Sequence, residues 1–109
     1  MSDILTHQDA GVLTLTFNRV ERKNSINVAM YDALATALEK AAGDAATRVV
    51  VIQGHETIFS AGNDIEDFLK NKPAGMDSTV FRFLRGIATF PKPLVAAVCG
   101  PAVGVGTTL

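Results

Sequence analysis

The sequence lacks several features that define whole classes of proteins. It has one cysteine, Cys99, among 109 residues, which excludes an internal disulfide framework and fits a reducing compartment. Because Cys99 follows an apolar run, we expect it to be a small buried side chain. The net charge of -1 shows no basic excess for nucleic acid, and no acidic tail is present. No apolar run approaches the roughly 20 residues of a membrane span, and Met1–Ile4 lacks the basic and apolar regions of a signal peptide. These absences predict a globular cytoplasmic protein with neither nucleic-acid nor membrane partners.

The length and the last residues suggest an incomplete domain. A chain of 109 residues holds one domain at most. It ends at Thr107–Leu109, directly after a glycine-rich turn that should start a helix. We therefore expect residues 1–109 to be the N-terminal part of a longer domain, with an apolar surface that another segment or chain covers.

The first half of the sequence predicts a hairpin followed by a helix. Apolar and polar residues alternate in Val12–Phe17, which follows the apolar run Ile4–His7 after a turn at Ala10–Gly11. Asn27 is a good N-cap for a helix that ends near Gly43. The helical stripe expected to face the core is Met30, Leu34, Leu38 and Ala41.

The second half predicts two more strands and another helix. Val49–Ile52 is a continuous β-branched run, which suits a parallel strand buried on both faces. A helix is expected to begin after Asp77 or Ser78 and to end before Pro91, and an apolar strand should follow at Leu94–Val98. The predicted core-facing stripe of this helix is Val80, Leu84 and Ile87. The alternation of strands and helices indicates an α/β fold.

Two runs of small residues carry most of the functional information. Phe-Ser-Ala-Gly-Asn-Asp occupies 59–64, and Gly-Pro-Ala-Val-Gly-Val-Gly occupies 100–106. Each follows an apolar segment predicted to be a buried strand, and each is expected to open a helix. Small residues allow a ligand to approach bare backbone N–H groups, and a helix N-terminus adds partial positive charge there. Two such turns aimed at one carbonyl oxygen would form an oxyanion hole.

Several polar side chains near these runs have simpler structural interpretations. Asp64 is better explained as a helix N-cap or ion-pair partner than as a catalytic acid. Ser60 lacks the nucleophile-elbow pattern, because Ile58 stands where its first glycine belongs. A solvated loop explains Arg19, Arg22 and Lys23 as well as a phosphate site does. The two histidines, His7 and His55, are expected in surface or loop positions.

Four segments in this order resemble the crotonase family, the enoyl-CoA hydratase/isomerase superfamily. They are 17–19 with 24–26, then 59–65, 91–98 and 100–106, and together they extend over almost the whole chain. One such marker is weak evidence, whereas four at these separations are a strong signal. The resemblance implies the N-terminal portion of a spiral of ββα units and acyl-CoA thioesters as ligands. It also implies no separate cofactor or metal, and homotrimers or dimers of trimers.

The resemblance also implies roles for individual residues. It places the first oxyanion-hole N–H at Ala61 and the second at Val105. It places the nucleotide part of coenzyme A against Arg22, Lys23 and Ser25. The remaining implied substrate-binding positions are Gly62, Asn63, Asp64, Ile65, Pro101, Val103, Gly104 and Thr108.

Thr108 stands where hydratases of this family carry a catalytic glutamate, and threonine cannot act as a carboxylate acid or base. The segments 62–64 and 100–104 look most like the enoyl-CoA delta isomerase branch, which moves a double bond with one base. The resemblance therefore implies isomerisation, or else hydration, of enoyl-CoA thioesters in fatty-acid or related acyl-CoA metabolism. We expect the base beyond Leu109, so that residues 1–109 alone would be inactive. A non-catalytic acyl-CoA-binding or oligomer-partner protein on the same fold stays open, as does an inert structural piece.

Overall fold

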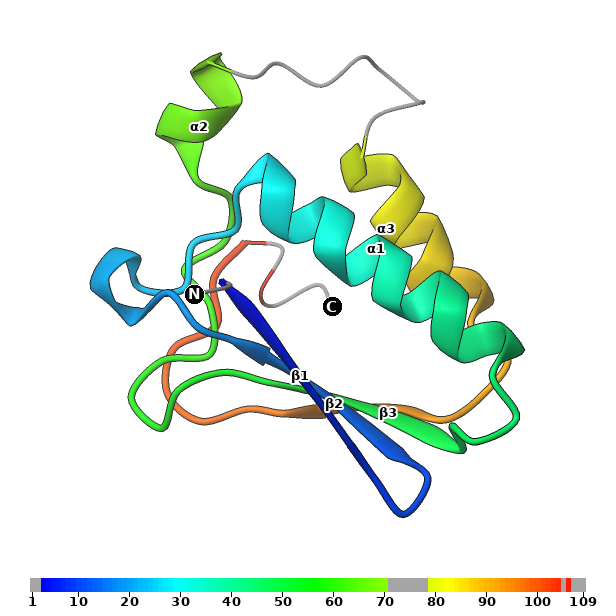
Figure 1. Ribbon diagram of the computed structural model, residues 1–109. Coiled ribbons are helices and arrows are strands. Elements are labelled where there is room, and N and C mark those ends of the chain that lie inside the picture. The colour runs from blue at the N-terminus through cyan, green and yellow to red at the C-terminus, as the bar shows by residue number, and fades with distance from the viewer. Residues whose placement is uncertain (1–2, 71–78, 105, 107–109) are drawn as a thin grey trace.

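The computed structural model describes residues 3–70, 79–104 and 106, which form a mixed sheet with helices on one face (Figure 1). The sheet has four strands in the order β1-β2-β3-β4 within this part of the chain. The strands are β1 (Ile4–Asp9), β2 (Val12–Phe17), β3 (Val49–Gln53) and β4 (Leu94–Ala97). The helices are η1 (Val20–Arg22), α1 (Val28–Gly43), α2 (Ile65–Lys70) and α3 (Thr79–Thr89).

The predicted N-terminal hairpin is confirmed. β1 and β2 are antiparallel, and their register pairs Ile4 with Phe17 and Asp9 with Val12. The two turn residues, Ala10 and Gly11, have φ of 50° and 84°, the left-handed backbone that short hairpin turns require. This register turns Phe17 into the core beneath α1.

The remaining strand pairs are parallel, as the apolar run at 49–52 predicted. β3 pairs with β2 on one side and with β4 on the other. Burial on both faces is wrong for the described residues, because Val50 and Ile52 are buried whereas Val49 and Val51 are only half-buried. The physical reason is visible in Figure 1, where α1 and α3 both cover the same face of the sheet.

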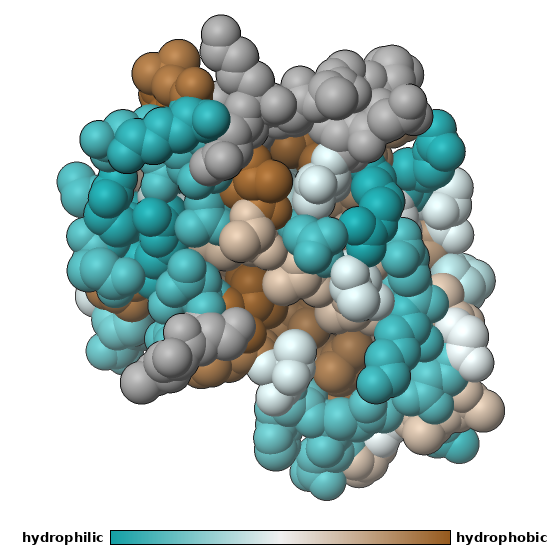
Figure 2. Space-filling view, turned by 45° about the horizontal axis from the view of Figure 1, so that its top comes forward, coloured by the Kyte–Doolittle hydropathy of each residue, from teal (hydrophilic) through white to brown (hydrophobic). Residues whose placement is uncertain are grey.

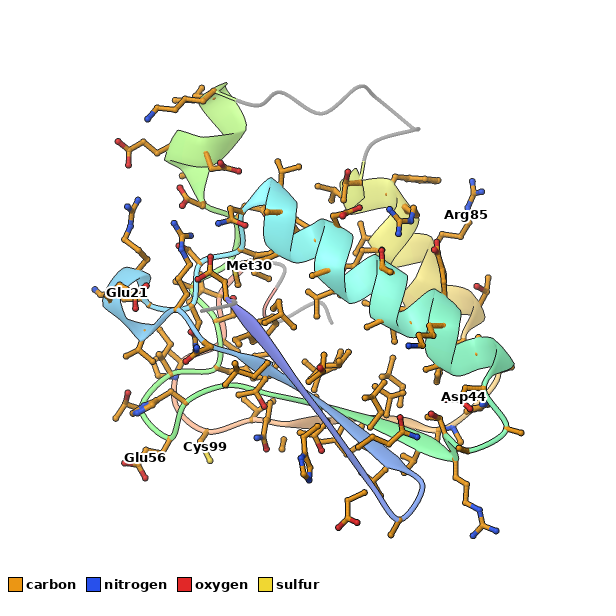
Figure 3. All side chains as sticks on the ribbon, in the orientation of Figure 1. Glu21, Met30, Asp44, Glu56, Arg85 and Cys99 are labelled. Atoms are coloured by element: carbon orange, nitrogen blue, oxygen red, sulfur yellow. The ribbon has the colours of Figure 1, made fainter. Side chains whose placement is uncertain are left out.

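The predicted N-cap, buried stripe and C-terminal end of α1 are confirmed. The Asn27 side chain accepts a hydrogen bond of 2.8 Å from the Met30 N–H and so caps the helix. The predicted stripe is buried, and Figure 3 shows its first member, Met30, near the start of α1. Gly43 is the last helical residue, and the chain leaves through Asp44 with φ of -93°, so no left-handed cap is needed.

A lysine from the segment before β4 closes the C-terminal end of α1. The Lys92 ammonium group donates to the carbonyl oxygens of Ala41, Asp44 and Thr47 at 2.6, 2.7 and 2.8 Å. A cation is favourable at this end because the last carbonyl groups of a helix lack intrahelical partners. Lys92 therefore fixes the position of β4 relative to α1.

α3 packs on α1 through a different side chain from the one predicted. Phe83 is fully buried, and its ring centroid lies 5.5 Å from that of Tyr31 in α1. Leu84, which was assigned to the buried stripe, is 37% exposed. Helical spacing allows either residue to face inward, and the contact with Tyr31 favours the phenylalanine. The predicted caps at Asp77 or Ser78 lie outside the described residues.

The last strand is less buried than its apolar sequence suggests. β4 ends at Ala97 rather than at Val98, and Val95 and Val98 are 49% and 51% exposed. Cys99 is also exposed rather than buried, and Figure 3 shows its side chain pointing out of the loop after β4. These predictions are wrong because no described element packs against this side of β4.

Candidate functional site

The two runs of small residues lie side by side at the edge where β3 and β4 end. The Phe59 N–H donates to the Pro101 carbonyl oxygen at 3.0 Å, and the Val103 N–H donates to the Ser60 carbonyl oxygen at 2.9 Å. Ser60 and Ala102 form a parallel bridge between these bonds. Parallel strands have their carboxyl ends at the same edge of a sheet, so the topology itself brings the two turns together.

Gly62 marks the point of closest approach between the two turns. Its φ is +91°, and a Cβ at this position would lie 2.9 Å from the Val103 carbonyl oxygen. The same atom would lie 3.7 Å from the Gly104 Cα. Both the left-handed backbone and the lack of space therefore require glycine here.

Ser60 holds the first turn and has no role as a nucleophile. Its side chain is fully buried, and its hydroxyl donates to the Asn24 carbonyl oxygen at 2.9 Å. The same hydroxyl oxygen accepts a bond of 3.1 Å from the Gly62 N–H. With both interactions made inside the protein, Ser60 is a structural residue, in agreement with the interpretation drawn from the sequence.

The structure argues against Ala61 as the first oxyanion-hole donor. The Ala61 N–H donates to the Lys23 carbonyl oxygen at 3.0 Å. Lys23 has φ of 56°, and this left-handed turn directs its carbonyl toward the first run. Because the Ala61 amide already has an internal acceptor, it is not available to a ligand, and this assignment is corrected.

Asn63 supplies the available N–H of the first run. Ile26 and Asn63 form a parallel bridge in which the Ile26 N–H donates to the Gly62 carbonyl oxygen at 2.7 Å. The Asp64 N–H donates back to the Ile26 carbonyl oxygen at 2.9 Å. Backbone groups of successive residues alternate in direction along such a ladder, so the Asn63 N–H points away from Ile26. It has no acceptor among the residues that the structure describes.

The second predicted donor, Val105, lies outside the described residues, as does Thr108. The other assigned members of the second run, Pro101, Val103 and Gly104, are exposed at the surface. On the side of the first run, Ile65 is 74% exposed at the start of α2. Figure 2 shows apolar surface gathered in a hollow between two polar margins of the molecule.

Asp64 is both an ion-pair partner and a helix cap, as predicted. One carboxylate oxygen accepts a bond of 2.8 Å from Arg19 Nη1, and the other accepts a bond of 3.1 Å from the Asp67 N–H in α2. These two hydrogen bonds, with Arg19 the stronger influence, hold the pKa of the Asp64 carboxyl below its usual value. A buried, ionised carboxylate whose oxygens both accept hydrogen bonds is a poor general base. Asp64 therefore has a structural role, in which it joins Arg19 to the start of α2.

We expect Asp64→Asn to destabilise the protein by about 3 kcal/mol at pH 7, because the nearly buried Arg19 loses its counter-charge. The pKa of Asp64 is lower in the folded protein than in the unfolded chain, so the ionised carboxylate stabilises the fold. This stabilisation is complete above the unfolded-state pKa of about 4, and it is lost as the pH falls through the lower, folded-state pKa. The free-energy difference between the two proteins should therefore shrink below pH 4. Urea unfolding from pH 7 to pH 2.5 measures it, and a difference that stays constant would contradict this role of the ion pair.

The residues assigned to coenzyme A lie at the end of η1 and in the loop that follows it. The Arg22 side chain lies 3.0 Å from Glu66 in α2, and the Ser25 hydroxyl accepts a bond of 3.2 Å from Arg19 Nη1. Lys23 is exposed, and its ammonium group has no ion-pair partner within the part of the chain that the structure describes. Lys23 is therefore the cation of this loop that can meet a phosphate without first breaking an internal ion pair.

Asn24 organises the site, although the sequence suggested no specific task for it. It is fully buried with φ of 54°, and its side-chain amide donates to the carbonyl oxygens of Ile58 and Phe59 at 3.3 and 3.2 Å. Its side-chain oxygen accepts a bond of 2.8 Å from the Arg19 N–H. The signal in the sequence was an asparagine in a polar segment, where left-handed backbone favours Asn or Gly.

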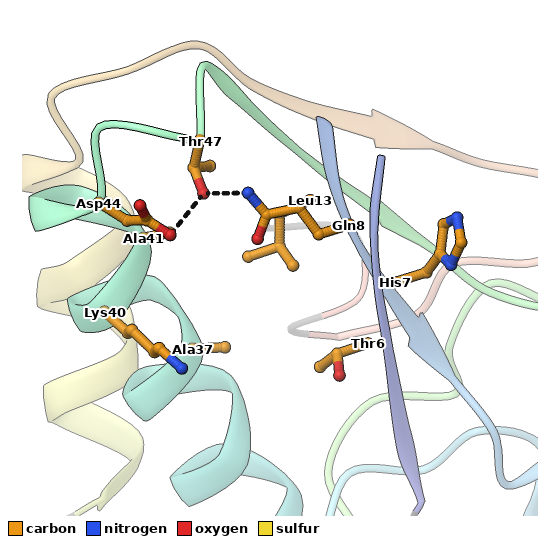
Figure 4. A pocket seen from close by; sticks show the side chains of 9 residues that line it. All are labelled: Thr6, His7, Gln8, Leu13, Ala37, Lys40, Ala41, Asp44 and Thr47. Carbon is orange, nitrogen blue, oxygen red and sulfur yellow. Dashed lines mark hydrogen bonds between the residues drawn. The ribbon is translucent and has the colours of Figure 1, made fainter. Parts of the chain in front are cut away.

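A cavity of about 200 Å³ lies elsewhere, between the hairpin and the C-terminal half of α1 (Figure 4). Thr47 accepts a bond of 2.9 Å from Gln8 there and donates one of 3.4 Å to Asp44. His7 lines this cavity from β1, and neither run of small residues reaches it. Three of its polar side chains, Gln8, Thr47 and Asp44, are thus paired with one another, and the cavity is separate from the two runs.

The described ranges hold neither a cluster of metal-ligating side chains nor a membrane-spanning helix. No group of three or more His, Cys, Asp or Glu side chains there could hold a metal ion. In the same ranges, no helix is long and apolar enough to cross a membrane. His55 is exposed, and its ring nitrogen pairs with the Thr57 hydroxyl at 2.7 Å in the loop before the first run.

Known proteins are similar to this chain in sequence and in fold. The family model for enoyl-CoA hydratase/isomerase matches residues 7–109. The chain is 35% identical to human enoyl-CoA delta isomerase 2 over 97% of its own length and 28% of that protein. It is 40% identical to 1,2-epoxyphenylacetyl-CoA isomerase of Escherichia coli K12 over its full length and 44% of that protein. The solved structure of Pseudomonas aeruginosa OdaA superposes with a TM-score of 0.94 at 47% identity, covering 99% of this chain and 44% of OdaA.

The chain therefore belongs to the enoyl-CoA hydratase/isomerase family, and its mixed sheet is part of the crotonase fold. It spans less than half the length of these relatives. The family assignment agrees with the resemblance found in the four sequence segments. Membership of the family does not define a single reaction, because the family includes both isomerases and hydratases.

Proposed function

We propose that the whole protein is an enoyl-CoA isomerase whose first oxyanion-hole donor is the Asn63 N–H and whose second is the Val105 N–H. One observation supports this most strongly: the two runs of small residues are held together while the Asn63 N–H has no acceptor among the described residues. A backbone donor held in place by the ladder with Ile26 needs no rearrangement when a ligand oxygen arrives. Val105 belongs to the run that lies against Gly62.

The chemistry that such a pair of donors supports is the movement of a double bond. Removing a proton from the carbon chain next to a thioester places negative charge on the carbonyl oxygen, as an enolate. Two N–H groups directed at that oxygen stabilise the charge as it develops, and one donor contributes about 3 kcal/mol. A carboxylate supplied outside this chain would take the proton from one carbon and return it to another.

Isomerisation is preferred to hydration because of Thr108. Adding water across a double bond needs groups that both activate the water and protonate the carbon, whereas moving a double bond needs one base. A threonine cannot replace a carboxylate in either task. Two relatives reported above are named as isomerases, which agrees with this choice. Hydration is the second candidate, because the family includes hydratases.

The loop after η1 would hold the coenzyme A portion of the substrate. Lys23 presents an exposed ammonium group, and its own carbonyl is bonded to Ala61 in the first run. A phosphate bound by the Lys23 side chain would therefore be connected, through the Lys23 backbone and its bond to Ala61, to the turn where the thioester reacts. Assembly into trimers, which the family resemblance implies, is part of the same proposal.

We expect the whole protein to isomerise a 3-enoyl-CoA at least tenfold faster than it hydrates the matching 2-enoyl-CoA. Side-by-side assays, with loss of substrate and identity of product followed by chromatography, measure both rates. Hydration outpacing isomerisation would overturn the choice of reaction and leave the family intact. Tight binding of both thioesters without turnover would overturn the proposal that the whole protein is an enzyme, and would favour a non-catalytic acyl-CoA-binding protein.

A further inference from the structure

Tyr31 connects the core of the protein to the residue that supplies the proposed oxyanion donor. The side chain is fully buried in α1, where its ring packs against Phe83. Its hydroxyl donates a hydrogen bond to the side-chain oxygen of Asn63. Tyr31 is the only tyrosine in the sequence. Neither its apolar surroundings nor its position in a helix suggested a link to the first run of small residues.

We infer that Tyr31 is a positioning residue, which fixes the Asn63 side chain and with it the direction of the Asn63 N–H. The inference rests on the proposed function, because it assigns a task to Tyr31 only if that N–H binds the substrate oxygen. Tyr31 is not a catalytic residue, since it acts through Asn63.

The contacts of Asn63 show what the bond from Tyr31 adds to the backbone ladder. Its neighbours along the chain are held by the ladder with Ile26, but Asn63 itself is exposed and its N–H points out of that ladder. The bond from Tyr31 adds an attachment to α1, an element that the packing of Phe83 holds in place. Catalysis depends on holding donors to within a fraction of an ångström, so an anchor in the core has a direct effect on rate.

The hydroxyl is suited to this task at any ordinary pH. Burial raises the pKa of Tyr31 to about 12, so the phenol stays protonated and remains a donor. Because it occupies the Asn63 side-chain oxygen, the amide orientation is set, and the Nδ2 group faces elsewhere. Nδ2 has no acceptor within the described ranges, so it is left to meet the ligand or solvent.

Tyr31→Phe in the whole protein tests the inference, because it removes the hydroxyl and keeps the ring. We expect kcat for isomerisation to fall about tenfold with KM within twofold, since one positioning bond is lost and no substrate contact. A conjugated aromatic enoyl-CoA gives a second readout. Its absorption band moves to longer wavelength when the bound carbonyl is polarised, and this shift should be smaller in the variant.

Two companion variants separate positioning from packing. Phe83→Leu loosens the same ring contact but keeps the hydroxyl, so we expect a lower unfolding temperature with kcat within twofold. In an Asn63→Ala background, which keeps the backbone N–H, Tyr31→Phe should cause no further loss, because its partner is already gone.

The inference would be overturned if Tyr31→Phe left kcat unchanged, or if it lowered kcat as much in the Asn63→Ala background as in the wild type. In either case, turnover by the wild-type protein would still uphold the proposed function. A wild-type protein that neither turns over enoyl-CoA nor shifts the absorption band would overturn the proposed function and the inference with it. The second result is seen before any variant is made, so the two failures are distinguishable.

Discussion

Replacing the backbone N–H of residue 63 with an ester oxygen should lower kcat/KM of the whole protein for a 3-enoyl-CoA by about 10²–10³-fold. The exchange, made by incorporating the corresponding α-hydroxy acid, keeps the side chain and removes one donor. In the structure this N–H has no internal acceptor in the described residues, so its loss should fall on the transition state rather than on the folded protein. Steady-state kinetics measure the rate, and thermal unfolding should show only a small loss, because the ester carbonyl of Gly62 accepts the Ile26 N–H less strongly.

The same exchange at residue 61 is the matched control. The Ala61 N–H donates to Lys23, so its removal should cost about 1 kcal/mol of folding free energy and leave kcat/KM within threefold. The opposite pattern, with the large rate loss at 61 and none at 63, would return the donor role to Ala61. This pair of variants therefore decides between the two residues, which the sequence alone does not distinguish.

Gly62→Ala should reduce kcat about 100-fold and destabilise the protein by about 2 kcal/mol. The new Cβ would lie 2.9 Å from the Val103 carbonyl oxygen, on a backbone with φ of +91°. Relief of that clash must move the two runs of small residues apart or twist one of them, and a shift of about 1 Å at a reacting centre can cost 10²-fold. The strained φ adds to the loss of stability. Kinetics and urea unfolding of the same preparation measure the two effects.

Gly43→Ala serves as its counterpart. Gly43 is the last residue of α1, its φ lies outside the left-handed region, and a Cβ there would meet no atom within 4 Å. We expect a gain of about 0.5 kcal/mol in folding free energy and unchanged kinetics, because alanine favours the helix. Equal kinetic losses in the two variants would contradict the claim that close approach at Gly62 sets the spacing of the site.

The sequence predicted those parts of the fold that short-range patterns determine. Alternation in Val12–Phe17 and the turn at Ala10–Gly11 were enough for the hairpin, and Asn27 was enough to place the start of α1. The inward face of α3 was predicted in part: Val80 and Ile87 pack against the core as expected, but Phe83 is buried in place of Leu84. Leu84 and Phe83 both satisfy helical spacing, and only the ring of Tyr31 across the interface decides between them.

The site was predicted to the level of segments but not of single atoms. The motif at 59–64 was correctly placed beside the motif at 100–106, since strand order and small residues bring them together. Which N–H is available depends on the Lys23 carbonyl, a distant backbone group that no local pattern reveals. The exposure of Cys99 was missed for a similar reason: an apolar segment predicts a strand, but it does not reveal whether another element covers that strand.

The hydrogen bonds that hold the first turn join residues that are far apart along the chain, and this has a kinetic consequence. Asn24 is separated by 34 positions from Ile58, and Arg19 by 45 positions from Asp64. Such contacts form only after β2, α1 and β3 have brought their ends together, because closing long loops costs entropy before any bond is gained. The donor turn is therefore a late event in folding. We therefore expect the sheet of a newly made chain to assemble before these hydrogen bonds hold the two runs of small residues together.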